Sequence, residues 1–85
     1  MKYYVYIIYS PSQDKYYTGY SADPLERQEE HNMGATASTR PGRPWILVYK
    51  EEYPNKHTAI IREKEIKKMK SRKFIESLIR QRSNG

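Results

Sequence analysis

Tyrosine and β-branched residues dominate two short segments near the start of the chain, residues 3–9 and residues 15–20. Side chains of these types favour β-strands. Residues 11–14 between them are turn formers, because proline restricts the backbone and serine and aspartate hydrogen-bond to nearby backbone groups. The pattern predicts an antiparallel hairpin, with Gly19 at a point where the backbone bends or is closely approached.

The polar stretch that follows carries a helix start. Asp23 can accept hydrogen bonds from backbone amides, Pro24 suits the first helical position, and Glu26 completes a capping box. We therefore expect a helix over residues 24–33, terminated near Gly34.

A loop and a third strand are expected next. Residues 35–44 hold glycine, proline and small hydroxyl side chains, which favour a loop. Residues 45–49 form a short continuous apolar run. Such a run suits the centre of a small sheet better than its edge.

Two helices are predicted in the last third of the chain. The first covers residues 56–70, where apolar side chains recur at helical spacing, at Ala59, Ile60, Ile66 and Met69. Ser71 is expected to cap the second, which has one apolar stripe of Phe74, Ile75, Leu78 and Ile79.

The predicted order is strand, strand, helix, strand, helix, helix. This order defines an α+β fold, a three-stranded antiparallel sheet flanked by helices. At 85 residues the chain suits a single domain over residues 1–85, with an ordered core over about residues 3–80. If the helices form one layer, they leave one face of the sheet open, and phenols on that face beside a basic helix would suit a nucleic-acid backbone.

The charge of the chain favours a polyanionic partner. Sixteen lysines and arginines against ten aspartates and glutamates give a net charge of +6 and an isoelectric point near 9.6. Nucleic acid is the natural partner for this balance, and a charged, solvated surface is the plainer alternative. The basic residues crowd the last quarter of the chain, at Lys64, Lys67, Lys68, Lys70, Arg72, Lys73, Arg80 and Arg82.

The absence of cysteine narrows the chemistry. It excludes a disulfide framework, a thiolate zinc site and a cysteine nucleophile, and it fits a reducing compartment. The start of the chain lacks the pattern of a signal peptide, and no apolar run is long enough to span a bilayer. We expect a cytoplasmic protein without a membrane partner.

Arg27 and His31 are the first candidates for chemistry. They lie four residues apart in the predicted helix, so both side chains project from one face and could reach the same phosphate. The alternative is a solvated helix in which Arg27 pairs with Glu26 or Glu30 and His31 simply ends the helix near its negative pole.

Glu63 is the strongest single candidate. It points along the apolar stripe of its predicted helix, whereas Glu65 is expected to face outward. A buried carboxylate needs a cation or hydrogen-bond donors. A magnesium ion held by one carboxylate, waters and a phosphate would meet that need. A salt bridge to Lys67 at i+4 is the alternative.

Further residues could bind the nucleic acid outside the reacting centre. Arg40 and Arg43 lie in the predicted loop and could grip a phosphate, and Trp45 could stack on a base or belong to the core. The whole set assigned to nucleic-acid binding is Arg40, Arg43, Trp45, Lys67, Lys70 and Arg72.

These residues together resemble a known family. Taken in order, Tyr4-Val5-Tyr6, Tyr17-Thr18-Gly19, Arg27, His31 and Glu63 resemble the GIY-YIG nuclease superfamily, in particular its short stand-alone bacterial, UPF0213-like members. Residues 24–27, 31–32, 43–49 and 62–67 also look like the matching stretches of those small proteins. The resemblance covers essentially the entire chain.

The resemblance implies roles for the candidate residues. It implies a sheet flanked by helices, a single divalent metal held by Glu63, and Arg27 steadying the phosphate. A tyrosine of one name-giving motif is proposed to help deprotonate the attacking water in that family, and we expect Tyr17 as this base and Tyr6 as an orienting group. His31 would then be a supporting or acid–base partner.

Three positions depart from the motifs of the family. Tyr4 replaces the first glycine, Thr18 replaces the central isoleucine of the second motif, and Tyr20 follows Gly19 where repair-type members carry lysine. None removes a presumed catalytic group. Small members of the superfamily lack the extra DNA-binding domains of larger relatives, so we expect weak binding alone or a protein partner that supplies specificity.

Two functions are therefore expected from the sequence. The first is an endonuclease dependent on Mg²⁺ or Mn²⁺ that hydrolyses DNA phosphodiester bonds, in structured or single-stranded DNA. The alternative is a non-catalytic module whose basic C-terminal face binds nucleic acid or docks on an acidic partner.

Overall fold

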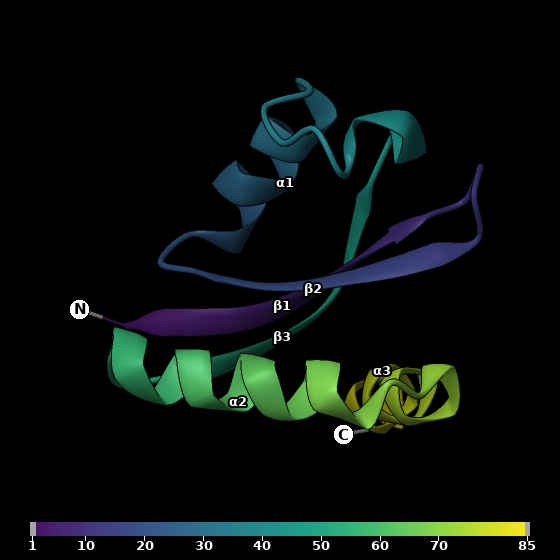
Figure 1. Ribbon diagram of the computed structural model, residues 1–85. Helices are drawn as coiled ribbons and strands as arrows, with labels where there is room; N and C mark the ends of the chain where they lie inside the picture. Colours follow the sequence, from purple (N-terminus) through teal and green to yellow (C-terminus); the bar gives the residue numbers. More distant parts are fainter. Residues whose placement is uncertain (1, 85) are drawn as a thin grey trace.

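The computed structural model describes residues 2–84, and side chains up to residue 81. Its elements are β1 (Tyr3–Ser10), β2 (Lys15–Ser21), α1 (Pro24–Asn32), a short 3₁₀ turn η1 (Arg40–Gly42), β3 (Ile46–Tyr53), α2 (Lys56–Met69) and α3 (Arg72–Asn84). The strands form one antiparallel sheet in the order β2-β1-β3. The predicted α+β fold and its order of elements are confirmed (Figure 1).

The predicted place of the third strand is wrong. β1, not β3, lies at the centre of the sheet, and β3 is an edge strand that continues past the apolar run to Tyr53. The reason is burial. Val5, Ile7 and Ile8 of β1 are fully buried, whereas Ile46 in β3 is about half exposed. The tyrosines that interrupt the apolar run of β1 hid its central position, because a tyrosine ring can be buried like an apolar side chain.

Helices cover both faces of the sheet, so the expectation of an open face is also wrong. Figure 1 shows α2 and α3 below the sheet and α1, with the segment that follows it, above. The core is divided accordingly. One cluster contains Val5, Ile7, Ala59, Ile66 and Leu78, and the other contains Tyr6, Ile8 and Trp45.

Local signals set the helix ends as predicted. Asp23 accepts a hydrogen bond from the backbone amide of Glu26 at 3.2 Å, and Ser71 accepts one from the amide of Phe74 at 3.1 Å. α2 ends at Met69, and Lys70 directly after it adopts a left-handed backbone conformation with φ of 47°.

The hairpin is confirmed, and Gly19 meets the predicted requirement. Gly19 lies opposite Tyr6 in the sheet. A Cβ atom at Gly19 would stand 2.5 Å from the phenolic oxygen of Tyr6. The glycine therefore leaves the room in which the phenol of Tyr6 lies.

Candidate functional site

Four of the five predicted catalytic residues line one open cleft of about 420 Å³. Tyr6 comes from β1, Tyr17 from β2, Arg27 from α1 and Glu63 from α2. The sheet contributes the phenols, and the helices on its two sides contribute the cation and the carboxylate. Residues far apart in the sequence thus converge in one cleft.

The fifth residue, His31, lies beneath the cleft and is fully buried. Its Nε2 is 3.0 Å from the phenolic oxygen of Tyr6, and its Nδ1 is 2.8 Å from Oγ1 of Thr39. The Tyr17 ring contacts the imidazole edge-on, with 5.1 Å between ring centroids. His31 is therefore more than a helix-terminating residue, because both ring nitrogens have specific partners.

The hydrogen bonds of Thr39 show which ring nitrogen of His31 carries the proton. The hydroxyl of Thr39 donates to the carbonyl oxygen of Thr36 at 3.2 Å. Having used its only proton, the hydroxyl accepts from Nδ1–H of His31. Nε2 of the neutral ring then carries a lone pair and accepts from the phenol of Tyr6. The chain of hydrogen bonds runs from Tyr6 to His31, Thr39 and the backbone.

Burial keeps both members of the central pair uncharged. Burial, with help from the nearby Arg27 guanidinium, lowers the pKa of His31 below its usual value. Burial raises the pKa of Tyr6 to about 12, and the neighbouring Tyr17 acts in the same direction. At neutral pH the Tyr6 phenol is a proton donor to a neutral imidazole.

Thr39 was not among the residues predicted from the sequence, and its hydrogen bond to His31 can be tested by mutation. Thr39→Val keeps the side-chain shape but removes the acceptor of Nδ1–H, so we expect the free energy of unfolding to fall by about 1–3 kcal/mol. Thr39→Ser keeps the hydroxyl and should retain most of the wild-type free energy of unfolding. Denaturant unfolding measures the stability, and ¹⁵N shifts of the imidazole report the tautomer. A Thr39→Val protein with wild-type stability and tautomer would contradict this assignment.

Arg27 is placed to face the cleft. Its Nη1 lies 3.0 Å from Oε1 of Glu30, and its Nη2 lies 3.4 Å from Oγ1 of Thr36. The guanidinium also acts to lower the pKa of the Tyr6 phenol, against the larger effect of burial. Arg27 thus forms the predicted pair with Glu30 and lines the cleft, whereas His31 is buried and does not line the cleft beside it.

Glu63 is nearly buried and forms the predicted salt bridge to Lys67. Its side chain is only 12% exposed, and Oε2 lies 3.6 Å from Nζ of Lys67 at i+4. Glu65 faces outward as expected, with 62% of its side chain exposed. The Glu63 carboxylate thus lies at the wall of the cleft beside one cation.

The donor set of the cleft fits a hard divalent cation. Among residues 2–84, no three histidine, cysteine, aspartate or glutamate side chains are grouped so that they could hold a metal ion together. Glu63 is a single carboxylate beside two phenols, Tyr6 and Tyr17. Mg²⁺ keeps several waters and is often bound through one or two carboxylates plus substrate phosphates, so one protein carboxylate is sufficient.

The loop residues assigned to nucleic-acid binding hold the fold together. Arg40 donates to the carbonyl oxygen of Gly34 at 3.1 and 3.0 Å, and Arg43 donates to that of Arg40 at 2.8 Å. Trp45 is only 5% exposed, and its Nε1 donates to the carbonyl oxygen of Thr39 at 2.6 Å. Its burial leaves no ring face for a base, so the stacking prediction for Trp45 is corrected in favour of the core.

Asn32, the last residue of α1, fixes that core. Its side-chain amide donates to the carbonyl oxygen of Trp45 at 3.0 Å and accepts from the amide of Trp45 at 2.5 Å. This pair of bonds ties the end of α1 to the start of β3. These bonds also fix the position of the residue that follows His31.

The basic residues at the junction of α2 and α3 differ from one another. Arg72 lies 2.6 Å from Oδ1 of Asp14 and 3.1 Å from Oε2 of Glu76. Lys67 pairs with Glu63, and its Nζ lies 5.5 Å from the centroid of the Tyr17 ring. Lys70 is exposed and lines a groove beside the cleft. Arg72 therefore has structural partners, and the two lysines lie nearer the site.

The sequence matches the family described as GIY-YIG catalytic domain over residues 2–75. The chain therefore belongs to the GIY-YIG nuclease family. It is 46% identical over 65 residues to a UPF0213 protein of Staphylococcus aureus, covering 75% of this chain and 78% of the relative.

A solved structure supports the same relationship. The solution NMR structure of a UPF0213 protein from Bacillus halodurans matches with a TM-score of 0.58 and 35% identity, covering 95% of this chain and 85% of that one. The predicted resemblance is thus confirmed. The family implies a nucleic-acid substrate and general dependence on a divalent metal. Within residues 2–84, no helix is long and apolar enough to cross a membrane.

Proposed function

We propose that this protein is a metal-dependent endonuclease that hydrolyses DNA phosphodiester bonds in the cleft. The observation that carries the proposal is the buried hydrogen bond from Tyr6 to His31, at the floor of a cleft that also contains Glu63 and Arg27. A purely structural cleft has no need of a phenol backed by a neutral imidazole.

The proton transfer is carried by the chain's own residues. The phenol of Tyr6 accepts a proton from the water that attacks the phosphate and passes its own proton to Nε2 of His31. A free phenol is a poor base at neutral pH, and a pKa raised to about 12 rules out a standing phenolate. A concerted transfer to the histidine avoids the phenolate altogether.

This assignment exchanges the two tyrosines of the sequence-based hypothesis. That hypothesis placed Tyr17 as the base and Tyr6 as the orienting group. Tyr6 has the acceptor for its proton, at 3.0 Å on His31, whereas the Tyr17 ring packs edge-on against the same imidazole. We therefore propose Tyr6 as the base and Tyr17 as the group that orients it.

Arg27 and Glu63 act on the phosphate. The Arg27 guanidinium binds the phosphoryl oxygens and stabilises the charge that develops on them, a contribution worth about 10²–10³ in rate for one such donor. Glu63 would hold the divalent metal, Mg²⁺ or Mn²⁺, which when bound neutralises phosphoryl charge and acidifies water. Lys67 beside Glu63 holds the carboxylate in place until the metal binds.

A cleavage assay tests the proposal. Labelled linear, nicked, flapped and four-way DNA, with RNA of the same sequences, are incubated with the protein in Mg²⁺, Mn²⁺ or chelator. We expect cleaved DNA with either metal and none with chelator. Binding without cleavage on every substrate would favour the alternative, a basic module that binds nucleic acid or a partner without cutting.

The pH dependence follows from His31. Arg27 and Glu30 of its own helix, Tyr6 and Tyr17 face this ring, and its folded pKa lies below its unfolded value of about 6.5. The unfolded chain thus binds the proton first, so the free energy of unfolding falls as pH drops below about 6.5. Protonated Nε2 also cannot accept from Tyr6, so the cleavage rate should fall on the acid side too.

Rate and stability profiles between about pH 5 and pH 8 check this expectation. His57→Gln is the control, because His57 is exposed at the start of α2. It should leave both profiles unchanged. A wild-type rate that is constant through the acid range would show that a neutral His31 is not required.

A further inference from the structure

A second hollow adjoins the cleft. It is a groove of about 440 Å³ between β2 and the junction of α2 and α3. Tyr17 lines both the groove and the cleft, so the two adjoin at this residue. Lys67 lines the groove and also pairs with Glu63 at the wall of the cleft. A strand bound in the cleft would therefore continue into the groove on this side.

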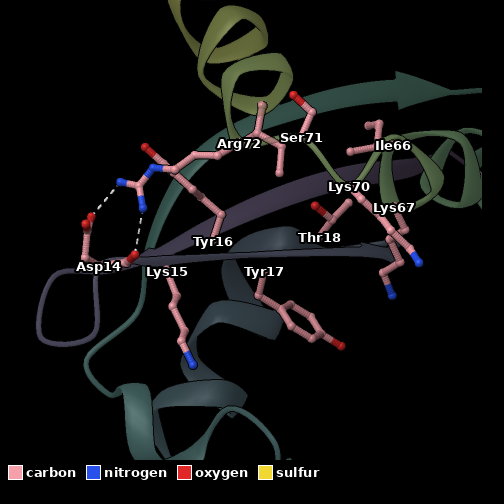
Figure 2. A pocket seen from close by; sticks show the side chains of 11 residues that line it. Asp14, Lys15, Tyr16, Tyr17, Thr18, Ile66, Lys67, Lys70, Ser71 and Arg72 are labelled. Atoms are coloured by element: carbon pink, nitrogen blue, oxygen red, sulfur yellow. Dashed lines mark hydrogen bonds and ion pairs between the residues drawn. The ribbon is translucent and has the colours of Figure 1, made fainter.

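The lining of the groove combines apolar and basic groups. Ile66 and Ile75 form apolar parts of its wall, and Lys15, Lys67 and Lys70 supply positive charge. Figure 2 shows the Lys67 and Lys70 side chains extending from the end of α2 past strand β2, with the Tyr17 ring nearby. This composition suits a nucleic-acid strand, whose phosphates need cations and whose sugars and bases present apolar surface.

The acid of the groove lining, Asp14, is paired with Arg72. Asp14 lies 2.6 Å from Nη2 of Arg72, as the dashed line in Figure 2 marks. Arg72 also pairs with Glu76 and stacks over the Tyr16 ring, 5.2 Å from its centroid. Beside this pair, Lys15, Lys67 and Lys70 add three cations to the lining, so the groove favours an anion.

The backbone of Lys70 provides an independent observation. Lys70 has φ of 47° and ψ of 41°, the left-handed conformation that is disfavoured by a Cβ atom and is usually given to glycine at the end of a helix. The chain does place a glycine, Gly34 with φ of 83°, just after α1. A lysine in a disfavoured backbone conformation beside a candidate site indicates that its side chain has a function there.

We propose that the groove binds the nucleic-acid strand next to the scissile phosphate, with Lys70 contacting a backbone phosphate. The proposal rests on the proposed function, because the cleft defines which phosphate is cut. The simplest competing explanation is that Lys70 only complements the negative end of α2. Lys67 and Lys68 already place positive charge in that last turn.

Lys70→Gly separates the two explanations. Glycine accepts the left-handed conformation, so the melting temperature should stay unchanged or rise by a few degrees. The positive charge is lost, so DNA affinity should fall roughly threefold to tenfold, and the slope of log affinity against log salt should fall by about one. Lys70→Arg should retain both affinity and slope.

Fluorescence anisotropy of a labelled DNA oligonucleotide in chelator, from about 50 to 200 mM salt, measures binding without cleavage. Lys64→Ala is the matched control, because Lys64 is an exposed lysine of α2 outside both linings and its loss changes the net charge equally. With metal, Lys70→Gly should raise KM and leave kcat unchanged.

Three outcomes would overturn a proposal. If the wild type cuts DNA but Lys70→Gly and Lys64→Ala bind DNA equally well, the proposed role of the groove is overturned and the nuclease proposal stands. If polyglutamate competes for the groove as well as unlabelled DNA does, the nucleic-acid role of the groove is overturned in favour of an acidic protein partner. Binding that depends on Lys70, with no cleavage in metal, would overturn the nuclease and leave the groove as a binding site.

Discussion

Tyr6→Phe should lower the rate of DNA cleavage by about 10²–10⁴ while the protein stays folded. Phenylalanine keeps the ring that packs with Ile8 and Trp45, so the core is preserved. Only the hydroxyl that hydrogen-bonds to His31 is lost. The rate is measured under single-turnover conditions with saturating protein, so that weaker binding does not contribute.

Stability measurements accompany this variant, because Nε2 of His31 loses its donor. We expect the free energy of unfolding to fall by about 1–3 kcal/mol, which a domain of normal stability tolerates. Tyr9→Phe is the matched control, since Tyr9 donates to Asp14 at 2.6 Å at the surface. A Tyr6→Phe protein that cuts as fast as Tyr9→Phe would exclude Tyr6 as the base.

Glu63→Gln should reduce cleavage to the level seen in chelator, a loss of at least about 10²–10³. Glutamine has nearly the same size and keeps a carbonyl oxygen toward Lys67, so the packing of α2 should persist. The amide is a poor ligand for Mg²⁺ compared with a carboxylate, and no second acidic side chain lines the cleft among residues 2–84.

The metal contact can be observed without any substrate. Mn²⁺ broadens NMR signals of nearby nuclei, so its addition should broaden the amide signals around Glu63 and Tyr17 in the wild type. The effect should be absent in Glu63→Gln. Glu65→Gln is the control, because Glu65 lies outward on the same helix. Equal broadening in all three proteins would place the metal elsewhere.

Local chemistry made most of the elements predictable. The caps Asp23 and Ser71 act on amides three residues away, so the sequence alone contains the interaction. Gly19 was predictable for a similar reason, since a glycine inside a tyrosine-rich strand indicates a close approach. The spacing of Arg27 and His31 indicated one helix face, the apolar neighbours of Glu63 singled it out, and the family resemblance implied a common site.

Long-range packing was not predictable in the same way. The central place of β1 depends on which strand is covered on both faces, and the apolar run of residues 45–49 gave the wrong answer. Trp45 could be either core or surface until Asn32 and Thr39 were seen to hold it. Thr39 carried no signal at all, because a threonine in a loop is common and its contact with His31 depends on the path of that loop.

The most direct measurement is the yield of cleaved DNA from the wild type and from Glu63→Gln, each titrated with Mg²⁺ in parallel reactions. Proposed roles for Tyr6, Arg27 and His31 all presuppose that this carboxylate brings metal to the cleft. We expect wild-type product that rises with Mg²⁺ to a plateau and disappears in chelator, and a flat background for Glu63→Gln. Equal Mg²⁺-dependent product from both proteins would contradict the assignment of the cleft as the catalytic centre.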